Sequence, residues 1–171
     1  MYYLYMVTMR SVRTISRKGL NEDNIGYFIS GFTEGEGSFN ISLRKKPDYK
    51  LGWQVVLSFN ISQKDVSVLN LVQETLNCGI IKTRKIDNLH SFDVTNAGDL
   101  TEKVIPFFQK YPLLSESKKI NFSIFCEFSN LVKRGEHIKE SGLNKILNLR
   151  EKINEGKGRT RKYSINDVFP I

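Results

Sequence analysis

The chain has 171 residues, about the length of one domain, and its 40% hydrophobic and 26% charged residues are typical of globular proteins. Lys and Arg number 26 against 18 Asp and Glu, and the net charge of +8 favours a polyanionic partner such as nucleic acid. No apolar run approaches the ~20 residues of a membrane-spanning helix, so we expect no membrane partner. The two cysteines, Cys78 and Cys126, lie far apart without a CxxC or Cys–His cluster, which excludes a disulfide framework and argues against a zinc site.

Residues 1–20 form a basic N-terminal extension that contains four cations and no acid. This composition is typical of a mitochondrial transit peptide, and equally of a basic arm that lies on nucleic acid. Both interpretations remain open. We expect the folded domain to occupy residues 21–171.

The first half of that domain is predicted to run helix, hairpin, helix. Apolar residues at helical spacing predict a helix over residues 24–34, which the sequence Gly35-Glu36-Gly37 ends. Alternation of polar and apolar residues then predicts two antiparallel strands, 38–45 and 53–63. Helical spacing returns over residues 65–76.

The second half begins with another hairpin, over residues 80–85 and 90–95. A short helix over 97–109, broken around Pro106 and Pro112, precedes two longer helices at 118–133 and 142–154, and a flexible basic stretch follows at 156–162. This order predicts an α+β fold with helices on one face of an antiparallel sheet.

The residues expected on the other, open face of the sheet carry amides, hydroxyls and cations, which are the groups that bind base edges and phosphates. A two-stranded ribbon also fits the major groove of DNA. A solvated sheet face is the alternative, but together with the basic charge the pattern favours nucleic acid. The predicted DNA-binding residues are Ser38, Asn40, Ser42, Arg44, Gln54, Ser58, Asn60, Lys82, Arg84 and His90.

The segment Ile29-Ser30-Gly31-Phe32-Thr33-Glu34-Gly35-Glu36-Gly37 resembles the LAGLIDADG motif of homing endonucleases. Residues 58–65 are similar to the end of the second strand in that family, and residues 111–119 to the approach to its third helix. One motif copy is present, so the chain resembles the intron-encoded, single-motif type. The resemblance implies an αββαββα core whose antiparallel sheet forms a concave DNA-binding saddle.

The resemblance also implies a homodimer in which two motif helices lie side by side on a two-fold axis. The interface would include Phe28, Ser30, Gly31 and Glu34. The two Glu36 carboxylates would then come together beneath the interface.

Glu36, Gln63 and Lys118 are the catalytic residues that the resemblance implies, with Lys119 as the alternative lysine. Glu36 and the backbone carbonyl of Gly35 would hold Mg²⁺, or another divalent cation such as Mn²⁺ or Ca²⁺.

The function implied is a site-specific DNA endonuclease that cuts both strands of a long pseudo-palindromic target by Mg²⁺-dependent phosphodiester hydrolysis, in a mitochondrion. The alternative is an intron RNA maturase or a catalytically silent DNA-binding protein of the same fold, with intron RNA as a partner in the first case.

Overall fold

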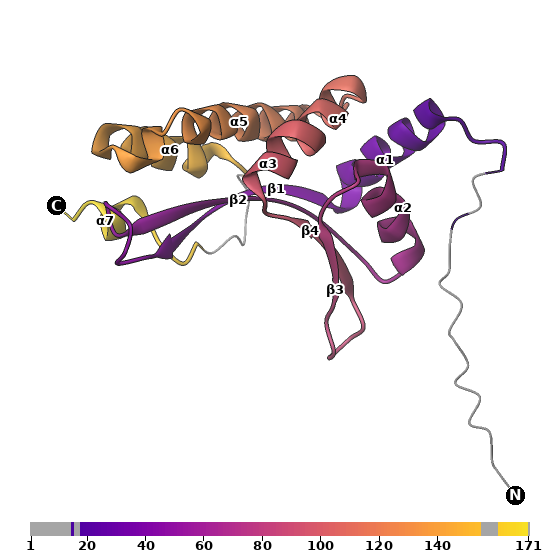
Figure 1. The fold of residues 1–171 in the computed structure, drawn as a ribbon, viewed down its shortest axis with the longest axis horizontal. Helices are drawn as coiled ribbons and strands as arrows, with labels where there is room; N and C mark the ends of the chain where they lie inside the picture. The colour runs from indigo at the N-terminus through magenta and orange to yellow at the C-terminus, as the bar shows by residue number, and fades with distance from the viewer. Residues whose placement is uncertain (1–14, 16–17, 155–160, 171) are drawn as a thin grey trace, which may run out of the picture.

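A four-stranded antiparallel sheet of order β1-β2-β4-β3 is covered by helices on one face and open on the other (Figure 1). The computed structural model describes Ile15, residues 18–154 and residues 161–170. Most of the predicted basic extension 1–20, and residues 156–160 of the basic stretch, therefore lie outside the described residues. The strands bend so that the β3–β4 hairpin extends away from the helices and the open face is concave. The predicted α+β fold is confirmed.

Helix α1 (Glu22–Glu36) leads directly into strand β1 (Gly37–Lys45) without a loop. The helix begins at Asn21, whose side chain accepts a hydrogen bond from Asn24 N at 2.7 Å while the Asn24 side chain accepts one from Asn21 N. At the other end the Gly37 N–H donates to Thr33 O. A Cβ on residue 37 would lie 2.4 Å from Thr33 Cγ2, so this abrupt junction requires glycine.

β1 pairs with β2 (Trp53–Gln63) along its whole length, from Gly37 opposite Ile61 to Lys45 opposite Trp53. Helix α2 (Val66–Leu76) follows, and β3 (Ile80–Thr83) and β4 (His90–Val94) form the second hairpin. The predicted helix and both predicted hairpins are confirmed.

A cluster of phenylalanines joins the sheet to the helices that cover it. On the sheet, the ring of Phe39 packs against Phe108 and Phe125 and the ring of Phe59 against Phe108, with centroids 5.2–5.4 Å apart, and all four rings are fully buried. This burial of aromatic surface anchors the long helix α5 (Glu116–Lys133) over β1.

The prediction that the helix after β4 breaks around Pro106 is wrong. The chain stays helical through α3 (Ala97–Asp99), a π-helical turn (Leu100–Val104) and α4 (Ile105–Lys110). Pro106 lies in the first turn of α4, where its missing N–H costs little. The helix ends at Lys110, before Pro112.

The chain finishes with a 3₁₀ turn (Glu136–Ile138), α6 (Glu140–Lys152) and a short helix α7 (Ile165–Val168). Helix α7 begins at Ser164, where a capping box with Asp167 holds its first turn. The ring of Tyr163 packs against Trp53 with centroids 4.9 Å apart, so this segment covers the far end of the β1–β2 hairpin. No helix in the described ranges is long and apolar enough to cross a membrane.

Gly26 provides a test of how α1 packs. An added Cβ would lie 2.4–2.5 Å from the ring of Tyr111, and overpacking of this kind costs about 1–3 kcal/mol. We expect Gly26→Ala to lower the free energy of unfolding by about that amount in urea denaturation. In a Tyr111→Ala background the penalty should vanish, and a penalty that persisted there would contradict the proposed clash.

Candidate active site

Three elements meet where α1 ends. The side-chain ammonium of Lys118, in the first turn of α5, donates to the carbonyl oxygen of Gly37. Gln63 is the last residue of β2, two positions beyond Ile61, which is paired with Gly37. The structure therefore joins the start of α5 to the residue after Glu36, and β2 ends two residues beyond the residue that pairs with Gly37.

Glu36 is exposed and is the last residue of α1. The helix predicted over residues 24–34 thus extends two residues further, to Glu36. Carbonyl groups in the last turn of a helix lack helical donors, and this end of the helix attracts cations. The Glu36 carboxylate and the Gly35 carbonyl thus supply hard oxygen ligands of the kind that Mg²⁺ prefers.

One chain provides only part of a metal site. Among the described residues no three His, Cys, Asp or Glu side chains gather closely enough to hold an ion. Mg²⁺ is commonly bound through one or two carboxylates, with water and substrate phosphates as the other ligands. A site with one carboxylate per chain fits that pattern when a phosphodiester is present.

Lys118 is half-buried, and burial lowers the pKa of its ammonium from the ordinary 10.5, an effect that the nearby Glu34 carboxylate opposes. Lys119, the alternative, is exposed. Only Lys118 of these two is recorded in contact with the end of α1, so the geometry favours Lys118 as the active-site lysine.

Glu34 holds the start of α5 against the end of α1. Its carboxylate accepts hydrogen bonds from Leu114 N, from Ser115 N at 3.0 Å and from Ser115 Oγ. Partial burial raises the pKa of Glu34, but these hydrogen bonds and the charge of Lys118 outweigh it, and the net shift is downward. The carboxylate predicted at the dimer interface is thus occupied within its own chain.

Ser30 is buried, and its Oγ lies 3.0 Å from Tyr111 O and 3.2 Å from Pro112 O. Its predicted place at the dimer interface is wrong, because this side of α1 faces the α4–α5 connection. Phe28 and Gly31 lie on the exposed side of the helix, as an interface would require.

The open face of the sheet carries a network of polar side chains. Asn40 Nδ2 donates to Asn60 Oδ1 across the β1–β2 pair, and Ser38 Oγ donates to Asn40 Oδ1, both at 3.2 Å. Ser42 and Arg44 are exposed, whereas Ser58 is partly buried beside them. At the distal end Gln54 Nε2 donates to the Tyr49 hydroxyl at 3.0 Å.

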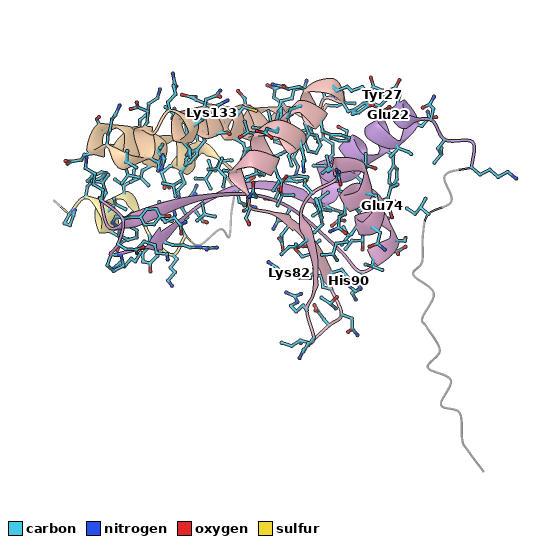
Figure 2. The ribbon with its side chains drawn as sticks, in the orientation of Figure 1. Glu22, Tyr27, Glu74, Lys82, His90 and Lys133 are labelled. Atoms are coloured by element: carbon cyan, nitrogen blue, oxygen red, sulfur yellow. The ribbon has the colours of Figure 1, made fainter. Side chains whose placement is uncertain are left out.

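The β3–β4 hairpin departs from the prediction at His90. Along β4 this residue alternates with the buried Phe92 and Val94, so it belongs to the helix-facing side of the strand. Its Nδ1 lies 2.9 Å from Thr83 Oγ1. Figure 2 shows Lys82 and His90 on opposite sides of the hairpin. His90 is therefore removed from the predicted DNA-binding set.

The same alternation places Asp93, an acid that the sequence prediction missed, on the open face. Lys82 lies 3.4 Å from its carboxylate, and Ser91 Oγ donates to it at 3.0 Å. Arg84 forms a paired contact with Asp87 in the adjacent turn, which lowers the pKa of that carboxyl to about 2. The hairpin cations are thus held in place by acids.

A protein-family model described as LAGLIDADG endonuclease matches residues 29–129, from the end of α1 to α5. That match spans more than half of the chain. The chain belongs to the LAGLIDADG endonuclease family.

Named relatives agree with this assignment. A probable intron-encoded endonuclease 2 of Neurospora crassa is 34% identical over 84% of this chain, which spans 32% of that relative. DNA endonuclease I-CeuI of Chlamydomonas moewusii is 30% identical over 97% of this chain and 76% of its own length. The chain therefore spans about a third of the Neurospora protein and most of the Chlamydomonas one.

Solved structures give the same picture. The archaeal intron-encoded homing endonuclease I-Vdi141I, complexed with DNA, superposes with a TM-score of 0.78 at 34% identity over 86% of this chain and 94% of its own. The LAGLIDADG homing endonuclease I-LtrWI, bound to target DNA, superposes with a TM-score of 0.79 at 31% identity, over 88% of this chain but 50% of its own.

Glu34 predicts a specific pH dependence of stability. Because its pKa is lowered from 4.5 in the folded chain, its ionised form stabilises the fold above that pH, and this contribution is lost as pH falls through the folded value. We expect Glu34→Gln to lower the Tm near neutral pH and to flatten the fall of Tm between about pH 5 and pH 3. The control Glu116→Gln, at an exposed site in the first turn of α5, should leave both unchanged. Parallel curves for the wild type and Glu34→Gln would contradict the role of Glu34.

Proposed function

We propose that the chain is a site-specific DNA endonuclease that acts as a homodimer and cuts both strands of a long pseudo-palindromic target with Mg²⁺. The observation that carries the proposal is the contact of Lys118 with Gly37, the residue that follows Glu36, at the junction of α1 and β1 beside which β2 ends at Gln63. A divalent cation bound at Glu36 would polarise a phosphodiester and lower the pKa of an attacking water.

The side chains around that point have separate roles in the proposed reaction. The Glu36 carboxylate and Gly35 carbonyl orient the cation, and the amide of Gln63 can hold a water by hydrogen bonding. The Gln63 carbonyl oxygen already accepts from Lys64 N at 2.7 Å, which leaves its NH₂ group to donate. The half-buried Lys118 ammonium would stabilise the negative charge that develops on the phosphate.

The exposed side of α1 supports the homodimer. A Cβ at Gly31 or Gly35 would meet nothing within 4 Å among the residues that the structure describes, so packing against them does not explain either glycine. Phe28 is 46% exposed beside them and stacks on Phe32. Two such helices could approach closely through the glycines and bury the aromatic rings, which would bring two Glu36 residues together.

The proposed mitochondrial location rests on the basic composition of residues 1–20 and on the resemblance to intron-encoded endonucleases.

Removing the charge of Glu36 tests whether DNA cleavage can be lost while DNA binding is kept. We expect Glu36→Gln to slow cleavage of duplex DNA containing the intron insertion site by about a hundredfold or more, because a cation ligand is lost. Binding of the same duplex in Ca²⁺ should change little, since the sheet face is untouched. Cleavage at the wild-type rate would overturn the metal assignment. Binding by the wild type without nicking under any divalent cation would favour the maturase or silent-binder alternative.

Gly31→Leu tests the homodimer. The wild type should sediment at twice the 19.7 kDa chain mass, whereas the leucine side chain should hold the helices apart and give the single-chain mass. Lys152→Leu, which adds the same side chain at the exposed end of α6, serves as control and should remain dimeric. A wild-type monomer on DNA would contradict the proposal.

A further inference from the structure

A small basic pocket lies along the free edge of β1, on the side away from β2. It has a volume of about 140 Å³ and is lined by Ile41, Ser42 and Leu43 of β1 and by Arg150, Arg161, Lys162 and Tyr163. Its cations come from α6 and from the C-terminal segment, two parts of the chain outside the candidate active site. A pocket of this size can hold a single phosphate-sized group.

Arg161 is fixed in this pocket by contacts with the end of α6. Its Nη2 lies 3.3 Å from both Glu151 O and Ile153 O, and its Nε lies 3.1 Å from a carboxylate oxygen of Glu151. Its Nη1 is buried and has no hydrogen-bond partner among the residues that the structure describes. The guanidinium thus keeps a donor for a further acceptor.

Arg150 forms the inner wall. Its side chain is 4% exposed, its Nη2 donates to Tyr163 O at 2.7 Å, and its Nη1 lies 3.7 Å from Glu151. Lys162 is exposed at the rim, with its ammonium 5.3 Å from the centre of the Tyr163 ring. Among the described residues, three cations line or rim the pocket and Glu151 is the carboxylate paired with two of them, so the electrostatics of the pocket favour an anion.

The backbone of β1 contributes hydrogen-bond donors to the pocket as well. Gly37 O and Phe39 O accept hydrogen bonds from Lys118 and Asn154, which lie outside the sheet. N–H and C=O groups of one residue in an antiparallel pair point to the same side, and the side alternates along the strand. Ile41 and Leu43 therefore direct their N–H groups toward the free edge, where the pocket lies.

We propose that this pocket binds a backbone phosphate of the target DNA, at the flank of the groove that the β1–β2 ribbon occupies; this rests on the proposed function. A ribbon that lies in the major groove presents its face to the bases and its edges to the two sugar–phosphate chains. The free edge of β1 is one of these edges. Arg161 and Lys162 are thus phosphate-binding residues that position the half-site.

The position of the pocket fixes where on the DNA this contact falls. Ser42 follows Glu36 by six residues along an extended strand, which corresponds to about 20 Å at ~3.3 Å per residue. With base pairs ~3.4 Å apart, the bound phosphate lies about six base pairs from the candidate active site. This is a contact on the outer part of each half-site.

The first experiment measures how salt affects binding of mixed-sequence duplex DNA in Ca²⁺, which requires neither cleavage nor a known target. The slope of log K against log salt is negative, and loss of one phosphate contact makes it less steep by about 0.9; we expect that change for Lys162→Gln. Lys162→Arg should restore the slope. The control Lys133→Gln removes a charge from the exposed helix layer at the top of Figure 2 and should match the wild type.

The second experiment places one uncharged methylphosphonate at each position of an insertion-site duplex. The wild type should lose affinity at a position about six base pairs outside the cleaved phosphodiester, and Lys162→Gln should lose nothing further there. Equal salt slopes and equal profiles for the two proteins would overturn the phosphate site while leaving the proposed function intact. A wild-type chain that binds no DNA would instead overturn the proposed function.

Inorganic phosphate distinguishes a free-anion site from a DNA contact. If millimolar phosphate raises the Tm of the wild type but not of Lys162→Gln, while both bind DNA identically, the pocket binds the free anion and the DNA assignment is wrong. Circular dichroism of each variant verifies that the C-terminal segment still folds.

Discussion

The direct passage of α1 into β1 at Gly37 is the constraint on which the site depends. Because no loop intervenes, the end of the helix has a fixed position over the first strand, and Thr33 leaves no space for a side chain at residue 37. Glu34 then ties the start of α5 to this junction, and Lys118 reaches back to Gly37 O. An exposed carboxylate and a half-buried ammonium are thereby held on rigid elements, as a phosphodiester site requires.

The glycines of α1 and the one that follows it, Gly37, differ in what surrounds them. Gly26 makes room for the ring of Tyr111 inside the chain, and Gly37 makes room for Thr33. Gly31 and Gly35 have open space around them and lie on the exposed side of the helix. The subunit therefore accounts for the first pair but not for the second, and glycine in a helix interior costs roughly 0.5–1 kcal/mol relative to alanine. A second helix against this side would explain why that cost is tolerated.

Local patterns predicted the elements well, because strand alternation and helical spacing directly reflect which side chains are buried. They failed where the environment of a residue depends on a contact with residues far away in the sequence. Ser30 looks like a small interface residue until Tyr111 and Pro112 fold over it. Pro106 reads as a helix breaker, but a preceding π turn makes it the start of a new helical segment. The sequence could have predicted the helix-facing side for His90. It alternates in step with the apolar Phe92 and Val94, whereas Ser91 and Asp93 lie on the open face.

The charges of the sheet explain how one surface could combine affinity with selectivity. On the β3–β4 hairpin, Lys82 and Arg84 are paired with Asp93 and Asp87, so binding a phosphate or base there must replace an existing ion pair. Replacing one ion pair by another adds little net free energy of DNA binding. The affinity then depends on how well the DNA groups match the geometry of the pair that they replace. Along the edge of β1 the balance differs, because in the described part of the chain Arg150 and Arg161 share the carboxylate of Glu151 and Lys162 adds a third cation. The edge would then supply much of the affinity for any duplex, and the paired face would discriminate among sequences.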